Sequence, residues 1–84
     1  MASTILVVED DPAQLRFLEL MVQRMGYRVL TAPGGPEALE ILMGPEREQV
    51  DLVVLDLVMP DLDGIGLLEK AHPVHPAPPM IVLT

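Results

Sequence analysis

The residues best suited to chemistry in this sequence are polar side chains that directly follow short apolar runs. They are Glu9, Asp10 and Asp11 after residues 5–8, Asp56 after residues 52–55, and Thr84 after residues 80–83. Each run is rich in β-branched residues and lacks polar alternation, which is typical of parallel strands buried on both faces. Because the carboxyl ends of parallel strands meet at one edge of a sheet, we expect four carboxylates and a hydroxyl to converge there.

Carboxylates at this edge would repel one another unless a cation lay between them. If the strands at residues 5–8 and 52–55 are neighbours, their spacing is about 4.8 Å, which makes the repulsion strong. Mg²⁺ accepts one or two carboxylates together with water and phosphate oxygens, whereas Zn²⁺ prefers His and Cys, which this edge lacks. The residue types therefore predict a magnesium site suited to phosphoryl chemistry.

Some of these polar residues also have a purely structural explanation. Asp11 stands before a predicted helix and either caps it or supports the site from behind. Asp56 lies inside the apolar pattern LVVLDLVMP, where a structural role would leave a partly desolvated charge without a partner, so a functional role is favoured. His72 and His75 lie among four prolines that exclude a shared helix, which favours solvated loop histidines over metal ligands.

The elements that must position this edge alternate between strand and helix. Apolar spacings of three and four predict a helix over residues 12–25, capped by Asp11, with Gln14 completing a capping-box-like spacing and Gly26 ending the helix. A weaker strand over residues 28–31 and helices over residues 36–43 and about 65–71 follow. This order predicts a doubly wound α/β parallel sheet with helices on both faces. The apolar stripe of the first helix comprises Leu15, Leu18, Met21, Val22 and Met25, and the second helix turns Ala38, Leu39 and Leu42 inward.

Composition limits the function classes. The 84 residues are 50% hydrophobic, which suits one domain over residues 1–84, and no apolar run reaches the roughly 18 residues of a membrane helix. Thirteen acidic residues against five cationic ones give a net charge of −8, which excludes direct binding of nucleic acid through its phosphates. The chain has no cysteine and no signal-peptide pattern, so we expect cytoplasmic residence.

Three separated motifs resemble the receiver domain of two-component response regulators. They are ILVVEDDP at residues 5–12, DLVVLDLVMPDLDG at residues 51–64 and MIVLT at residues 80–84, and TAPGGPEAL at residues 31–39 is similar to the family's second crossover. The resemblance covers essentially the whole chain. It implies a flavodoxin-like sheet with strand order 2-1-3-4, in which the fifth strand and the last two helices of the family are missing.

The resemblance also implies roles for individual residues. Asp56 would accept a phosphoryl group from a sensor histidine kinase, a phosphotransfer protein or a small phosphodonor. Asp10 and Asp56 would bind Mg²⁺, Glu9 would assist through a water, and the backbone carbonyl of Val58 would supply a further metal oxygen. Thr84 would hydrogen-bond the phosphoryl group. The chemistry would be limited to phosphorylation and dephosphorylation of the chain itself, because an aspartate is a weak nucleophile that needs the metal to neutralise phosphoryl charge.

The sequence departs from the family after its fourth strand. Receivers continue with a helix, a fifth strand that ends in a lysine, and a final helix, whereas Lys70, the one lysine here, is predicted on a helix surface. We therefore expect an incomplete receiver that self-associates through an exposed sheet edge or face. The alternative is a scaffold that binds partners independently of phosphorylation. A small phosphohydrolase is disfavoured because the sequence offers no substrate pocket or dedicated acid or base.

Overall fold

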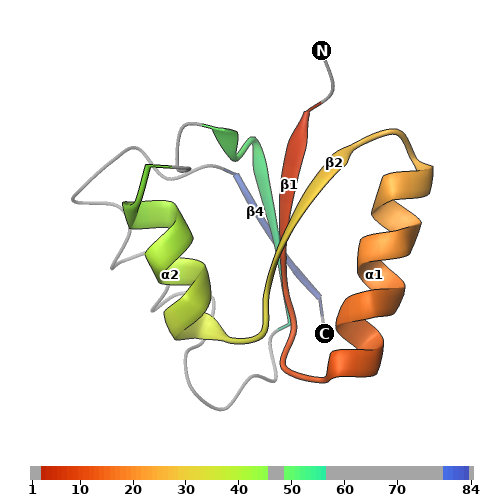
Figure 1. Ribbon diagram of the computed structural model, residues 1–84, viewed down its shortest axis with the longest axis horizontal. Coiled ribbons are helices and arrows are strands. Elements are labelled where there is room, and N and C mark those ends of the chain that lie inside the picture. The colour runs from red at the N-terminus through yellow and green to blue at the C-terminus, as the bar shows by residue number, and fades with distance from the viewer. Residues whose placement is uncertain (1–2, 46–48, 57–78, 84) are drawn as a thin grey trace.

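The computed structural model describes residues 3–45, 49–56 and 79–83 of the chain. Its elements, shown in Figure 1, are β1 (Thr4–Val8), α1 (Pro12–Arg24), β2 (Arg28–Ala32), α2 (Gly35–Met43), β3 (Leu52–Asp56) and β4 (Met80–Leu83). All of these elements were predicted from the sequence, and every boundary agrees to within one residue. The predicted helix at about residues 65–71, Lys70, His72 and His75 lie outside the described residues.

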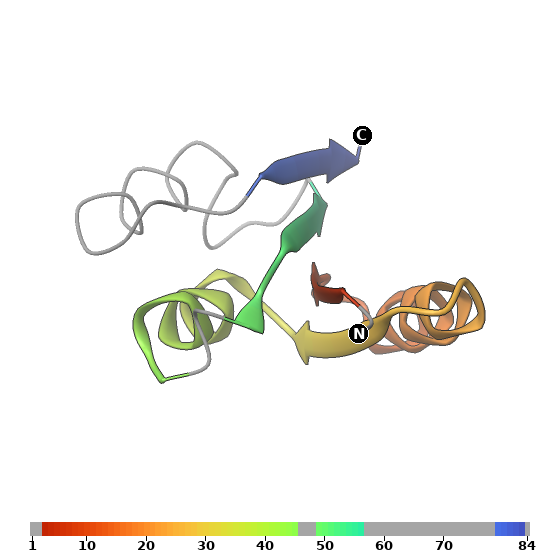
Figure 2. The same cartoon turned by 90° about the horizontal axis from the view of Figure 1, so that it is seen from above.

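The four strands form one parallel sheet in the order β2-β1-β3-β4, which confirms the predicted order. β1 lies inside the sheet, where Val8 pairs with Ala32 of β2 on one side and with Leu55 of β3 on the other. Figure 2 shows α1 and α2 on opposite faces of this sheet. The doubly wound α/β architecture is therefore confirmed for the described part of the chain.

The face of the sheet toward α2 carries the hydrophobic core. Side chains alternate between the two faces of a strand, and on this face Val53 and Leu55 of β3 are both fully buried. They belong to one cluster with Ala38 and Leu42 of α2, which the helical spacing turns toward the sheet. Leu39 is half-buried against the same cluster. The inward residues predicted for this helix are thus confirmed.

Helix α1 covers the opposite face only in part. None of its 13 residues is buried. Leu15, Leu18 and Val22 are half-buried, whereas Met21 and Met25 at the C-terminal end are 46% and 67% exposed. The apolar spacing correctly predicted the helix. Only part of the predicted apolar stripe is half-buried, however, and the rest is exposed to solvent. No helix within the described ranges is long and apolar enough to cross a membrane.

The uncovered part of this face lies over β3 and β4. Leu52 and Val54 of β3 are half-buried there, and Ile81 of β4 is 49% exposed. Figure 2 shows α1 beside β1 and β2, with none of the described elements over β3 and β4 on the same side. The sheet therefore buries the face toward α2 well, whereas Ile81 on the other face remains exposed to water.

The ends of the helices determine where the chain enters and leaves the sheet. Gly26 follows α1 with a φ of +95°, a conformation that L side chains rarely adopt, and it turns the chain into β2 as predicted. Gly44 caps the end of α2, and Pro45 follows it, in agreement with the predicted Gly-Pro stop. The other end of α1 begins with Pro12, shortly after Val8, so this helix starts at the carboxyl end of β1, where the candidate site lies.

Candidate functional site

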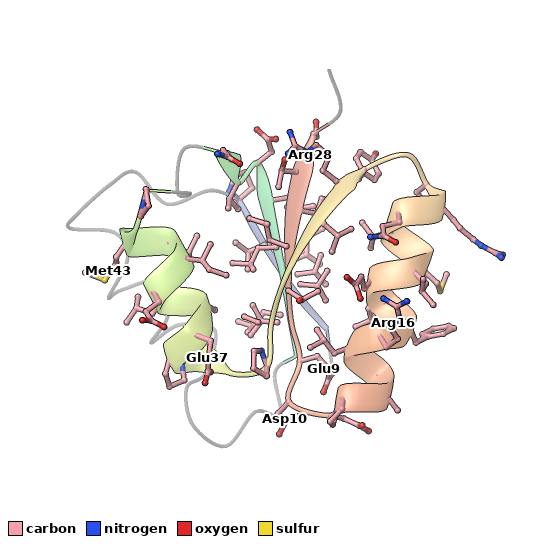
Figure 3. All side chains as sticks on the ribbon, in the orientation of Figure 1. Glu9, Asp10, Arg16, Arg28, Glu37 and Met43 are labelled. Atoms are coloured by element: carbon pink, nitrogen blue, oxygen red, sulfur yellow. The ribbon has the colours of Figure 1, made fainter. Side chains whose placement is uncertain are left out.

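The acidic residues predicted to form the site meet at the carboxyl edge of the sheet. Glu9 and Asp10 follow the last residue of β1, and Asp56 is the last residue of the neighbouring strand β3. Because Val8 pairs with Leu55, the parallel register brings the backbone of Asp56 beside that of Glu9. Figure 3 shows Glu9 and Asp10 at the end of the sheet where the chain leaves β1 for α1.

Strand β4 ends at the same edge. The backbone of Asp56 pairs with Leu83, the last residue of β4, and Thr84 follows Leu83 in the sequence. Thr84 and Val58 lie outside the described residues, and so does the side chain of Asp56. The register therefore places the backbone of Asp56 between the ends of β1 and β4, in agreement with the strand order that the resemblance implied.

Glu9 is the buried carboxylate of this edge. Its residue is 4% exposed, and its backbone N–H donates to the carbonyl of Ala32 at 3.1 Å, which extends the pairing of β1 with β2. Its Oε2 accepts the backbone N–H of Asp11 at 3.2 Å. A buried carboxylate without hydrogen bonds or a cation would be strongly destabilising, so this contact contributes to holding Glu9 at the strand end.

Asp11 is exposed and caps α1. Its Oδ1 accepts the backbone N–H of Ala13 at 3.0 Å, and its extended backbone is that of an N-cap residue, which confirms the predicted cap. The capping-box prediction for Gln14 was wrong, because the N–H of Asp11 donates to Glu9 instead. The physical reason is that burial fixes Glu9 two residues before the cap, whereas Gln14 is exposed.

Asp10 lies between these two residues and is exposed. Its neighbours each hold a backbone group of the turn, through Glu9 Oε2 and Asp11 Oδ1, so the turn that carries Asp10 is fixed on both sides. Asp10 therefore presents a solvent-accessible carboxylate from an ordered backbone. Its side chain makes no hydrogen bond or ion pair with the residues that the structure describes, so it can bind an ion without first losing such a contact.

The donor chemistry of the edge is that of carboxylate oxygens, which suits a hard divalent cation. Two members of the predicted ligand set, Glu9 and Asp10, are described in full. The remaining donors, the carboxylate of Asp56 and the carbonyl of Val58, lie outside the described atoms. Within the described side chains alone, no three His, Cys, Asp or Glu residues form a group that could hold a metal ion.

Asp51 is a hydrogen-bonded carboxylate that the sequence patterns did not single out, and it lies at the opposite edge of the sheet. Its Oδ2 accepts the backbone N–H of Thr4 at 2.8 Å, and its own N–H donates to the carbonyl of Thr4 at 2.8 Å. Asp51 therefore joins the starts of β1 and β3. Its place directly before a strand, rather than after one, is the sequence signal that separates it from Asp56.

Comparison with known sequences identifies close relatives. The family model of the response regulator receiver domain matches residues 5–84. The transcriptional regulatory protein GlrR of Escherichia coli (strain K12) is 44% identical over 80 residues, which are 95% of this chain and 17% of that protein. The alkaline phosphatase synthesis transcriptional regulatory protein PhoP of Bacillus subtilis (strain 168) is 38% identical over 84 residues, 100% of this chain and 34% of that protein.

Solved structures agree with these relatives. A response regulator receiver domain protein from Clostridium thermocellum superimposes with a TM-score of 0.88 and 30% identity, over 98% of this chain and 64% of that one. The receiver domain of the hybrid histidine kinase CckA gives a TM-score of 0.82 and 35% identity, over 95% and 73%. The chain thus spans well under two thirds of the curated relatives that it matches. From the sheet order, the acidic edge and the match over residues 5–84, the chain belongs to the response regulator receiver domain family.

Proposed function

We propose that this chain is a phosphoacceptor, in which Asp56 receives a phosphoryl group from a histidine kinase or phosphotransfer protein in the presence of Mg²⁺. The observation that carries the proposal is the register that sets the backbone of Asp56 beside Glu9 and between the ends of β1 and β4. Membership of the receiver family supports it, because receivers interact with these two classes of protein.

The proposed transfer exchanges one bond to phosphorus for another. A carboxylate oxygen of Asp56 forms a bond to phosphorus while the phosphorus–nitrogen bond of a donor phosphohistidine breaks. The electron pair of the broken bond stays on the donor imidazole, and the product is an aspartyl phosphate. Thr84, which follows β4, would donate a hydrogen bond to the transferred group.

The residues proposed to hold Mg²⁺ are Glu9, Asp10 and Asp56, with the carbonyl of Val58 as a further oxygen. When bound, the ion supplies positive charge against the phosphoryl oxygens. Glu9 and Asp10 would have different roles in holding the ion. Glu9 is 4% exposed and tied to the turn, so its carboxylate oxygens are held in place, whereas the exposed Asp10 can meet an entering ion directly.

Intact mass spectrometry tests the acceptor role. After incubation with acetyl phosphate and Mg²⁺, the chain should gain the mass of one phosphoryl group, and the Asp56→Asn variant should gain none. The matched control is Asp51→Asn, which changes a carboxylate to an amide just before the same strand but at the opposite edge of the sheet, and it should keep the gain. Chelation of Mg²⁺ should abolish the mass gain of the unchanged chain.

Two outcomes would contradict this function. No gain in the unchanged chain would favour the phosphorylation-independent scaffold. A gain that survives in Asp56→Asn would place the phosphoryl group on another residue. The proposed chemistry involves this one aspartate and turns over no separate substrate.

The second part of the proposal concerns the location of the chain in the cell and its association with other molecules. A kinase partner implies a cytoplasmic location, and the net charge of −8 argues against direct contact with nucleic acid. Among the described strands none pairs with the outer edge of β4, and none of the described elements covers β3 and β4 on the side of α1, which supports self-association. Sizing chromatography with light scattering should show a dimer or a larger species, and a stable dilute monomer would contradict it.

A further inference from the structure

The outer edge of β2 bounds the sheet on the side away from β4. Within the described residues β2 pairs only with β1. The N–H of Arg28 donates to the carbonyl of the residue before β1 at 2.9 Å, and the carbonyl of Ala32 accepts the N–H of the residue after β1 at 3.1 Å. Because backbone groups alternate between the two sides of a strand, the N–H and C=O groups of Val29 and Thr31 point away from β1. They form no hydrogen bond with any residue that the structure describes.

This edge offers a short stretch for strand pairing. Pro33 follows β2 and has no N–H, and the backbone groups of Arg28 and Ala32 are directed toward β1, so only the residues between them can pair outward. The two connections of β2 lead to α1 and α2, and Figure 2 shows β2 between these helices at the outside of the sheet. Strand edges that lack a partner readily pair with a strand of another chain.

A hollow of about 610 Å³ lies where this edge ends. Its lining includes Thr31 and Pro33 at the end of β2 and Glu37 and Ile41 of α2. Glu37 is exposed and forms no ion pair within the described part of the chain. The end of the β2 edge therefore opens into a hollow with a negative charge that can accept a cationic side chain.

The start of β2 carries the complementary charge. Arg28 is exposed and has no ion pair among the described side chains. It alternates with Leu30 and Ala32, which pack in the core on the α2 face, so its side chain leaves the strand on that same face. Figure 3 shows Arg28 and Glu37 at opposite ends of the sheet, so these two side chains do not meet within one molecule.

A second copy of the chain fits this edge when the two β2 strands run antiparallel. In an antiparallel pair, residues whose backbone groups point toward each other exchange both of their hydrogen bonds. With Leu30 at a twofold axis, Val29 of each copy lies opposite Thr31 of the other, and every outward N–H and C=O group finds a partner. A register shifted by two residues would match only one of these two residues with an outward-facing residue. Because the axis is perpendicular to the sheet, it keeps both α2 helices on one face and brings Arg28 of each copy beside Glu37 of the other.

We propose that two copies of this chain join their β2 edges antiparallel about a twofold axis, with Arg28 of each copy entering the hollow of the other beside Glu37. The chain carries −8 overall, so two copies repel each other unless opposite charges meet, and this arrangement forms the Arg28–Glu37 contact twice. The inference specifies the surface of the self-association proposed above and rests on it. It is independent of phosphorylation, because neither Mg²⁺ nor Asp56 takes part.

An exchange of charges tests the contact between the copies. Arg28→Glu should weaken the dimer about tenfold or more, because two attractive contacts become repulsive, and Glu37→Arg should do the same. The double variant should recover most of the affinity, since opposite charges meet again across the twofold axis. The matched control is Arg24→Glu, which makes the same change of charge on α1. Arg24 lines a different hollow, with Met21, so this control should leave the dimer nearly unchanged. Sedimentation over a concentration series, without Mg²⁺ or phosphodonor, measures all of these variants, and circular dichroism checks that they fold.

The strand pairing is tested separately from the charges. Thr31→Pro removes an outward N–H that the second copy needs, but it removes no bond to β1, because the N–H of Thr31 points away from that strand. This variant should stay monomeric at concentrations at which the unchanged chain is a dimer. Hydrogen exchange followed by NMR gives a second readout. The amides of Val29 and Thr31 should exchange about tenfold or more slowly in the dimer than in the dilute unchanged chain.

The contrary outcomes can be told apart. A dimer that is insensitive to both Arg28→Glu and Thr31→Pro would overturn the proposal in favour of another surface, such as the outer edge of β4. A loss of affinity in Arg28→Glu without recovery in the double variant would overturn the contact with Glu37. A monomer at every concentration would overturn self-association itself. None of these results would bear on phosphorylation of Asp56, which the mass measurement tests.

Discussion

The side chain of Glu9 holds the backbone of Asp11, with 3.2 Å between Glu9 Oε2 and the Asp11 nitrogen. Glu9 is buried at the end of β1, and Asp11 is exposed and caps α1 with its own carboxylate. A buried acid thus orders the turn from which Asp10 projects. The turn and the proposed metal site therefore share a residue, and substitution of Glu9 can separate its two roles.

The Glu9→Gln variant should keep the turn and lose charge. An amide oxygen can still accept the N–H of Asp11, so the free energy of unfolding should change by about 1 kcal/mol or less. The affinity for Mg²⁺ should fall by roughly tenfold, because a nearby negative charge is removed. Titration calorimetry and denaturant unfolding measure the two effects. Glu40→Gln, on the exposed side of α2, is the control and should alter neither. Unchanged Mg²⁺ affinity in Glu9→Gln would limit Glu9 to ordering the turn.

Asp11 should prove to be a cap that does not bind the ion. Asp11→Ala should lower the free energy of unfolding by about 1 kcal/mol, because the N–H of Ala13 loses its acceptor, whereas Asn is as good a cap as Asp. Asp11→Asn should therefore preserve both stability and Mg²⁺ affinity. A marked loss of Mg²⁺ affinity in Asp11→Asn, measured by the same calorimetric titration, would instead assign this carboxylate to the site.

Local patterns predicted the elements of this fold because their causes are local. The strands follow from runs of β-branched residues, α1 from its apolar spacing and its cap at Asp11, and its end from Gly26, whose φ is +95°. The strand order came from the resemblance to receivers. The convergence of Glu9, Asp10 and Asp56 then follows from topology, because neighbouring parallel strands end at the same edge.

The features that the sequence did not predict depend on what covers each residue. Periodicity groups Met21 and Met25 on one side of α1, but it does not predict that both remain exposed. Their exposure depends on whether another element packs against them, which a local pattern does not reveal. The spacing predicted that Gln14 accepts the backbone N–H of Asp11, whereas the buried Glu9 accepts it. The pairing of Thr4 with Asp51 joins residues 47 apart in the sequence, which no local pattern reveals.

Gly26 and Gly44 should resist substitution for different reasons. A Cβ at Gly26 meets no atom within 4 Å, but φ is +95°, so Gly26→Ala should lower the free energy of unfolding by about 1–2 kcal/mol through backbone strain. A Cβ at Gly44 would lie 2.8 Å from the carbonyl oxygen of Glu40, which is a steric cost. Asn tolerates positive φ, so it should recover part of the loss at Gly26 and none at Gly44. Equal recovery at both positions, in denaturant unfolding, would contradict these two causes.

Removal of the Asp51 side chain should destabilise the sheet without changing the chemistry of its other edge. Thr4 is 5% exposed, so in Asp51→Ala its N–H loses an acceptor in a largely buried place, at a cost of about 1–3 kcal/mol. Asp51→Asn keeps an oxygen acceptor and should lose much less. The backbone bond from Asp51 N–H to the Thr4 carbonyl remains in both variants. Denaturant unfolding at one chain concentration should rank them in this order, and the folded fraction of each should accept a phosphoryl group as the unchanged chain does. Equal stability of the two variants would mean that the Thr4 N–H finds water in place of the carboxylate.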